Sequence, residues 1–297
     1  MNSKTGESAP RGLAAERPSA PQHEHGLPRV RIESEEAGVT LNLGDLWVYR
    51  ELLYFLTLRD IKVRYKQTLM GAAWAVIQPL MTMLIFTLVF NKFARLDTGE
   101  VPYPLFAYSG LLVWTFFSSS VATGTYSLVN NSHLVTRVYF PRLFIPAASV
   151  GAGLVDMGIA SVLLFALAAY YGATPTWGLV LLPAFVLLTT ALALGAGVLV
   201  SALTVKYRDL RHALPFVMQF WMFASPVIYP SSLVPSGWRW ILFANPLAGA
   251  VEGFRSSVTG RPFDWPLVAA SAAWAALLVA AGLYVFRRLE DTFADVI

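Results

Sequence analysis

Few residues in this chain could carry out chemistry. The sequence has no phosphate-binding loop ending in GKS or GKT, no HExxH, no GxSxG and no cysteine. The one acidic residue inside a long apolar segment is Asp156, in the run GLVDMG. Such a carboxylate is either a proton or substrate site, or a group hydrogen-bonded to a neighbouring helix or lining a wet cavity. The second interpretation is favoured because no other buried acid or base could complete a relay. We therefore expect no catalytic residue, no metal and no cofactor in this chain.

The composition is that of a membrane protein. Hydrophobic residues make up 56% of the 297 positions, charged residues make up 13%, and the mean hydropathy is +0.55. Such a chain is too apolar for an ordinary soluble domain. The net charge of +4 does not indicate a nucleic acid partner, because basic loops set the orientation of membrane proteins. No polar segment interleaves aromatic residues with a basic groove, as nucleic acid binding would require.

Six apolar segments predict an all-α integral membrane protein with six transmembrane helices. They lie near 70–90, 105–129, 145–170, 178–203, 213–229 and 265–286. Apart from Asp156 they contain no Asp, Glu, Lys or Arg, and a charge at mid-membrane costs about 2.5–3.5 kcal/mol on insertion. Most of the intervening Lys and Arg residues fall before the first segment and after the second, fourth and sixth. The positive-inside rule therefore predicts that both termini are cytoplasmic.

A charged stretch must position the first of these segments. We expect a disordered or weakly ordered tail at 1–40, an amphipathic interface segment at 41–69 and a transmembrane domain at 70–297. Thr57 and Asp60 suggest a capping box at a helix start, and Asp60 is placed to pair with Arg64 one turn later. The charged residues singled out in this segment are Arg50, Arg59, Asp60, Lys62, Arg64 and Lys66. A basic amphipathic helix of this kind lies in the plane of a membrane surface.

The loop at 130–146, NNSHLVTRVYFPRLFIP, mixes apolar and basic residues. It is either a membrane-surface turn with arginines reaching to the interface, or a surface that fits a groove on a partner. The residues that could make such a contact are Leu134, Arg137, Val138, Tyr139, Phe140, Pro141 and Arg142.

The loop between the fifth and sixth segments contains two apolar pieces, 238–243 and 247–254, that are too short to cross a membrane. Asn245 and Pro246 separate them, so interfacial or re-entrant helices are expected here. Glu252 and Arg255, three residues apart, are expected to form a structural ion pair.

Aromatic side chains recur along the apolar segments. Belts at the membrane interface explain most of them, and a planar ring could also stack on a sugar along a transport path. The aromatic residues considered for such a path are Trp74, Tyr108, Trp114, Phe117, Phe220, Trp221 and Tyr229.

Taken together, these stretches resemble the membrane subunit of a type-2 ABC transporter, in the branch that exports polysaccharides such as O-antigen, capsule or teichoic acid. The resemblance rests on RELLYFLTLRDIKVRYKQTLMGAAWAVIQPL, VTRVYFPRLFIP, VKYRDLRHALPF, SPVIYP, NPLAGAVEGFR and FRRLEDTFADVI. These pieces cover about 45–297 in the expected order.

The resemblance implies a permease of the bacterial cytoplasmic membrane, working as two copies with two copies of a separate ATPase subunit that binds ATP and magnesium. It implies an interface helix at 57–68, a loop at 130–142 that docks into the ATPase, and two short helices within 231–254 that cap the pathway outside. The substrate would be a lipid-linked glycan. Its pyrophosphate would lie near the basic residues of the entrance, Arg50, Arg59, Lys62 and Arg64.

Three other functions remain compatible with the sequence. A type-2 ABC exporter of drugs or lipids would share the same pattern. A stand-alone secondary transporter or channel would need an ion or proton site, for which only Asp156 is available. A membrane-embedded transferase would need paired carboxylates or a His and Asp constellation in a loop.

Overall fold

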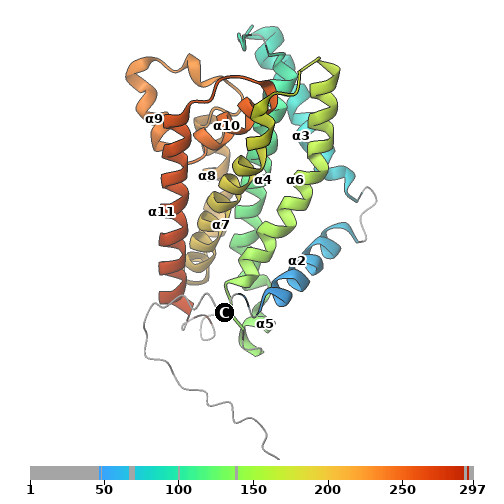
Figure 1. Cartoon of the computed structure of the whole chain (residues 1–297). Coiled ribbons are helices and arrows are strands. Elements are labelled where there is room, and N and C mark those ends of the chain that lie inside the picture. The colour runs from blue at the N-terminus through green and yellow to red at the C-terminus, as the bar shows by residue number, and fades with distance from the viewer. Residues whose placement is uncertain are drawn as a thin grey trace, which may run out of the picture. The chain divides into compact units, whose positions relative to one another are not determined.

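Long apolar helices dominate the chain. The computed structural model describes residues 47, 49–66, 71–99, 101–137, 140–290 and 293, and every element within these ranges is a helix (Figure 1). Five stretches of this described part are long and apolar enough to cross a membrane. They are α3 with its π-helical extension η1 (Ala73–Phe86 and Thr87–Phe93), α4 (Tyr103–Asn130), α6 (Phe144–Tyr170), the 3₁₀ turn η2 with α7 (Trp177–Leu181 and Leu182–Lys206) and α11 (Trp265–Glu290). The tail expected at 1–40 lies outside the described residues.

The fifth expected span, 213–229, is not one long helix. The structure instead has α8 (Leu210–Ala224), whose 15 residues extend about 22 Å, less than the roughly 30 Å of a bilayer core. The helix stops at Ser225, which has extended backbone angles (φ −98°, ψ 148°). Ser225 precedes Pro226, and the residue before a proline is disfavoured in the α conformation. The apolar run therefore continues past the end of the helix.

α4 is the central helix. It packs against α6, α7 and α10 (Ala248–Thr259). In the most apolar stretch of α4, 78% of the residues are buried, whereas in that of α3 with η1 only 11% are. On the other side of α7, α11 packs so closely that a Cβ on Gly282 would lie 2.7 Å from the carbonyl oxygen of Gly195. α4 is thus enclosed by other helices, while α3 leaves most of its surface uncovered.

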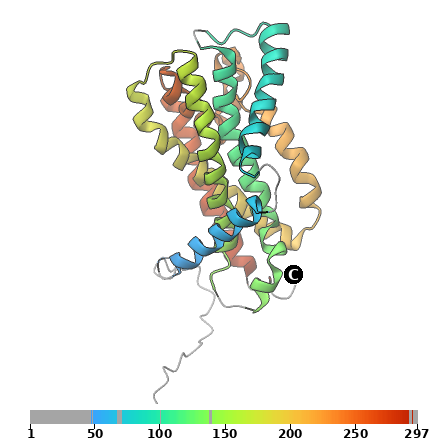
Figure 2. The same ribbon diagram turned by 90° about the vertical axis from the view of Figure 1, so that its right-hand side faces the viewer.

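α2 (Arg50–Tyr65) lies obliquely across the lower end of the long helices in both views and packs against α6 (Figures 1 and 2). It begins well before Thr57, whose hydroxyl donates to the carbonyl oxygen of Leu53 at 2.8 Å. A threonine inside a helix commonly bonds back one turn in this way. The expected capping box at Thr57 is therefore wrong.

Short helices fill the connection between α8 and α11. After the 3₁₀ turns η3 (Ser231–Leu233) and η4 (Ser236–Trp238), α9 (Arg239–Ala244) ends at Asn245, and α10 follows. The two apolar pieces expected here are thus helical, and they are separated at the expected place. α9 and α5 (Ser132–Arg137) lie at opposite ends of the bundle (Figure 1).

Candidate functional site

Asp156 ties α6 to the end of α2. Its carboxylate accepts hydrogen bonds from the guanidinium of Arg64 and the hydroxyl of Tyr65. The side chains of Arg64 and Asp156 are 27% and 22% exposed, so the other described residues bury the pair only in part. Of the two interpretations of Asp156, a carboxylate hydrogen-bonded to a neighbouring helix is therefore confirmed. The expected pair of Asp60 with Arg64 is not formed, because Asp60 accepts from Arg59 at 2.8 Å instead. Burial raises the pKa of Tyr65, and the charge of Arg64 opposes this rise.

A groove of about 280 Å³ lies beside this ion pair, bounded by α2, α3, α4 and α6; we refer to it as the Trp74 groove. α3 contributes Trp74 and Gln78, and α4 contributes Thr115 and Ser119, each pair spaced by one helical turn. The Trp74 side chain is 56% exposed. The hydroxyl of Thr115 and the side-chain amide of Gln78 have no hydrogen-bond partner among the described residues. The groove therefore combines an aromatic plane, two unpaired polar groups and a neutral ion pair.

The basic residues expected at the entrance fall into two groups. Arg50, Lys62 and Lys66 are exposed, and of these Arg50 donates to the carbonyl oxygen of Trp47 at 3.1 Å and lies over its ring. Arg59 and Arg64 instead form ion pairs within the chain. Arg64, which the resemblance assigned to a pyrophosphate, is therefore already neutralised by a carboxylate.

The loop expected to meet a partner begins with the short helix α5. His133 and Thr136 are exposed on it, and Leu134 is half-buried. The predictions for Val138 and Tyr139, and for the side chain of Arg137, lie outside the described residues.

The same loop then returns to the body of the protein. Phe140 is 8% exposed and belongs to an apolar cluster with Phe144 and Phe286. After Pro141, the guanidinium of Arg142 donates to the backbone carbonyl oxygen of Glu290, at the end of α11. Phe140 is therefore a core residue that cannot enter a partner's groove, contrary to expectation.

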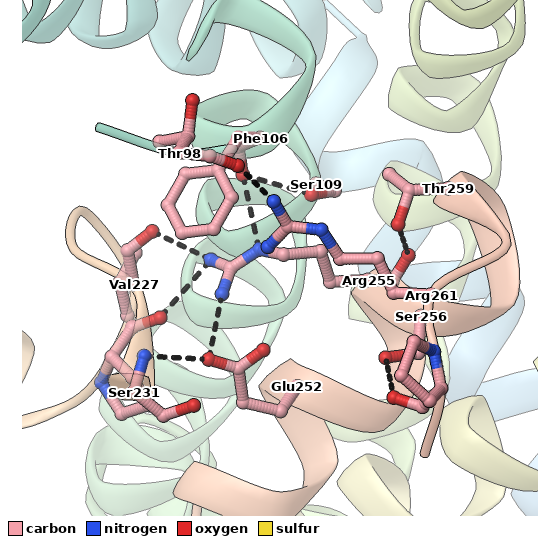
Figure 3. Close-up of polar contacts among 12 residues, drawn as sticks. Thr98, Phe106, Ser109, Val227, Ser231, Glu252, Arg255, Ser256, Thr259 and Arg261 are labelled. Carbon is pink, nitrogen blue, oxygen red and sulfur yellow. Dashed lines mark hydrogen bonds and ion pairs between the residues drawn. The ribbon is translucent and has the colours of Figure 1, made fainter. Parts of the chain in front are cut away.

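At the other end of α4, Arg255 of α10 forms the centre of a buried polar cluster (Figure 3). Its side chain is 0% exposed and forms an ion pair with Glu252 at 3.2 Å, so the expected structural pair is confirmed. It also donates to the carbonyl oxygens of Phe106 (3.3 Å), Pro226 (3.0 Å) and Val227 (2.8 Å). Burial lowers the pKa of Arg255, and the charge of Glu252 opposes this. One side chain thus links α4, the segment after α8 and α10.

The surroundings of this cluster leave no spare room. The guanidinium carbon of Arg255 lies 3.6 Å from the ring centre of Phe106, and Arg261 donates to the carbonyl oxygen of Thr98 nearby. A Cβ added to Gly110 would lie 2.5 Å from a guanidinium nitrogen. No pattern in the sequence indicates that Gly110, Arg261 or Thr98 belongs to this cluster.

Asn245 joins the short helices to α8. Its side-chain oxygen accepts from the indole nitrogen of Trp221 and from the backbone N–H of Leu247, both at 3.0 Å. Its side-chain nitrogen donates to the hydroxyl of Ser225 at 2.8 Å and to the carbonyl oxygen of Ala224 at 3.1 Å. Asn245 is 7% exposed, and these bonds hold the turn between α9 and α10 in place.

The aromatic residues considered for a path have different surroundings. Tyr108, Trp114 and Phe117 are buried around α4, and the hydroxyl of Tyr108 donates to the carbonyl oxygen of Ala160 at 2.9 Å. They form part of the core of this chain and not its surface. Phe220, like Trp74, is exposed. Trp221 and Tyr229 are partly buried beside the core.

Comparison of the sequence with known proteins shows the family of this chain. The sequence profile of the ABC-2 type transporter family matches residues 51–259, from α2 to the end of α10. The chain belongs to the ABC-2 type transporter family. An O-antigen export system permease protein of Myxococcus xanthus is 32% identical over 255 residues, which are 84% of this chain and 97% of that protein. One from Klebsiella pneumoniae is 28% identical over 264 residues, 86% of this chain and 97% of that protein. A polysialic acid transport protein of Escherichia coli is 24% identical over 213 residues, 68% and 79% of the two chains.

The matched range of this ABC-2 chain includes the Trp74 groove and the ion pair of Arg255 with Glu252. The family inferred from the sequence is confirmed. The groove itself was not predicted, although the four-residue spacing of Thr115 and Ser119 within an apolar segment could have indicated a polar face. Gln78 and Tyr65 gave no comparable indication, because their neighbours in space come from other helices.

Proposed function

We propose that this chain is the membrane subunit of an ATP-driven exporter that moves a lipid-linked polysaccharide across the cytoplasmic membrane. ATP is hydrolysed by a separate subunit. The observation that carries the proposal is the alignment over 97% of a protein named as an O-antigen export permease. The five apolar helices support it, and the absence of a phosphate-binding loop from this sequence agrees with an ATPase in a separate subunit.

The proposed orientation places α5, the end of α11 and both termini on the cytoplasmic side. The last turns of α7 and α11 carry Lys206 and Arg287 with Arg288, which agrees with the positive-inside rule. α2 would lie at this surface with Lys62 and Lys66 exposed to water or lipid headgroups. α8 and the apolar residues after it would complete a sixth crossing that only partly consists of helix.

The proposed assembly contains two copies of this chain and two ATPase subunits, which hold the ATP and magnesium. The exposed face of α5, with His133 and Thr136, is the contact to the ATPase. Closure of the ATPases on ATP drives export only if the two conformations of the complex bind ATP differently. The internal contact of Arg142 with Glu290 would then pass a displacement of α5 to α11.

Purification of the tagged chain in mild detergent tests this proposal. A stoichiometric partner with a phosphate-binding loop and vanadate-sensitive ATP hydrolysis is expected. A chain that emerges alone after crosslinking, without ATP hydrolysis, would overturn the assignment and favour a stand-alone carrier.

A pair of variants tests the docking surface. Thr136→Arg on α5 should release the ATPase and stop export. Ser236→Arg, also at an exposed site but near α9 at the opposite end of the bundle, should do neither. Retention of the ATPase in Thr136→Arg, or its release in both variants, contradicts docking through α5.

A further inference from the structure

The Trp74 groove has the chemistry of a sugar-binding site, and we propose that it holds one sugar unit of the lipid-linked substrate. The proposal rests on the proposed function and names the part of the substrate that this site receives. The volume of about 280 Å³ is at the lower end of ligand pockets, so it suits a single ring and not a glycan chain.

The aromatic wall of the groove is the side chain of Trp74. Its ring is more than half exposed, although it lies close to the start of α3 and beside polar residues of other helices. A sugar has an apolar face of C–H groups and an edge of hydroxyls. An indole plane buries the apolar face while leaving the hydroxyls to polar partners.

The polar walls supply those partners. Gln78 offers an amide donor and acceptor, and Thr115 offers a hydroxyl that has no partner among the described residues. The hydroxyl of Ser119 donates to the carbonyl oxygen of Phe116 at 3.3 Å, which leaves its oxygen able to accept. A hydrocarbon tail in the groove would leave these groups unsatisfied, whereas sugar hydroxyls both donate and accept.

The charge of the groove distinguishes the sugar from the phosphate. Its lining contains one cation and one anion, Arg64 and Asp156, and these are bonded to each other. A pyrophosphate requires unpaired cations or several N–H donors, and the groove offers no such excess. The exposed Lys62 of α2 and Lys66 directly after it carry charges that could meet the phosphates, while the neutral groove fits an uncharged ring.

The test compares probes that differ only in a sugar. Farnesyl pyrophosphate and its glucosyl, galactosyl and N-acetylglucosaminyl derivatives would be titrated against the complete transporter in lipid nanodiscs. At least one sugar-bearing probe should bind about tenfold more tightly than farnesyl pyrophosphate, as expected for one or two added contacts. Trp74→Leu and Thr115→Val should each reduce that preference by about fivefold to tenfold, with farnesyl pyrophosphate binding unchanged within about twofold.

Matched variants guard against indirect effects. Trp74→Phe keeps a ring and should retain most of the preference. Trp177→Leu removes an equally large side chain that is 89% exposed and absent from the groove, so it should change nothing.

Three outcomes would overturn the assignment: no sugar-bearing probe is preferred, the preference survives in both Trp74→Leu and Thr115→Val, or all four probes weaken equally. The last result would assign the groove to lipid tails or headgroups. A complex that retains its ATPase and exports glycan, yet shows no sugar preference, refutes the groove alone and leaves the proposed function intact.

Discussion

Replacing Arg255 by methionine should destabilise the transporter more than any exposed arginine replacement. Methionine keeps the apolar stem and removes the guanidinium, so Glu252 is left 13% exposed without its cation. The carbonyl oxygens of Pro226 and Val227 lose their donor as well. Removing one partner of a buried ion pair costs about 3–5 kcal/mol. For a chain of this size, that loss should lower the melting temperature by roughly 10 °C.

Arg239→Met is the matched control. Arg239 pairs with Asp264 at 3.0 Å, close to the 3.2 Å of the buried pair, but its side chain is 52% exposed. An exposed pair contributes about 0–1 kcal/mol, because water already solvates both charges. The two arginines thus differ in burial and in the number of backbone carbonyls they bind.

Replacing Glu252 should change the melting temperature in opposite directions with and without Arg255. Glu252→Leu alone should lower the melting temperature, because it leaves Arg255 buried and unpaired. In the Arg255→Met background the same Glu252→Leu change should raise it, because it removes an uncompensated buried charge. The melting temperatures of all variants would be measured on the purified complex by scanning fluorimetry. Equal losses in Arg255→Met and Arg239→Met, or a further loss in the double variant, would refute this account.

Three further effects can be measured in the same assay. Gly110→Ala should be strongly destabilising, since its methyl group would lie 2.6 Å from the carbonyl oxygen of Val227; a melting temperature within about 1 °C of the parent would contradict the close approach. Asn245→Ala should cost about 1–3 kcal/mol for each buried group that loses its partner, and Asn245→Asp should cost at least as much, because its carboxylate is buried without a cation and faces the carbonyl oxygen of Ala224. Asp156→Ala should cost only about 1 kcal/mol, because Arg64 is 27% exposed and can be solvated; a loss as large as that of the buried pair would show otherwise.

The sequence predicts the long helices well because length and absence of charge are local properties. Where an uncharged apolar run of this length faces lipid, a helix satisfies the hydrogen bonds of its backbone within the segment itself. The fifth span shows the limit, since 213–229 is uncharged and mostly apolar, but Pro226 disfavours the α conformation at Ser225 and α8 ends early. The mean hydropathy of a segment does not detect a helix that ends before a proline.

Most contacts within the site could not be predicted from the sequence, because their partners lie far apart along the chain. Local spacing assigned Arg64 to Asp60, but its partner lies 92 residues away on another helix. Phe140 was assigned to a partner's groove because it stands in a loop, yet the end of α11 covers it. In both cases the deciding neighbour comes from a distant segment. Glu252 and Arg255 could be paired correctly because they share one helical turn.

The ion pairs Arg64–Asp156 and Arg255–Glu252 differ in how much free energy their separation should cost. Arg255 is fully buried and bound to three segments, so separating it from Glu252 exposes unsatisfied charge and three carbonyl groups. Arg64 and Asp156 are 27% and 22% exposed, so separating them leaves less unsatisfied charge buried among the described residues. The Arg64–Asp156 pair should therefore cost less free energy to separate than the Arg255–Glu252 pair. A small loss for Asp156→Ala beside a large loss for Arg255→Met is what this difference requires, and equal losses would remove the basis for it.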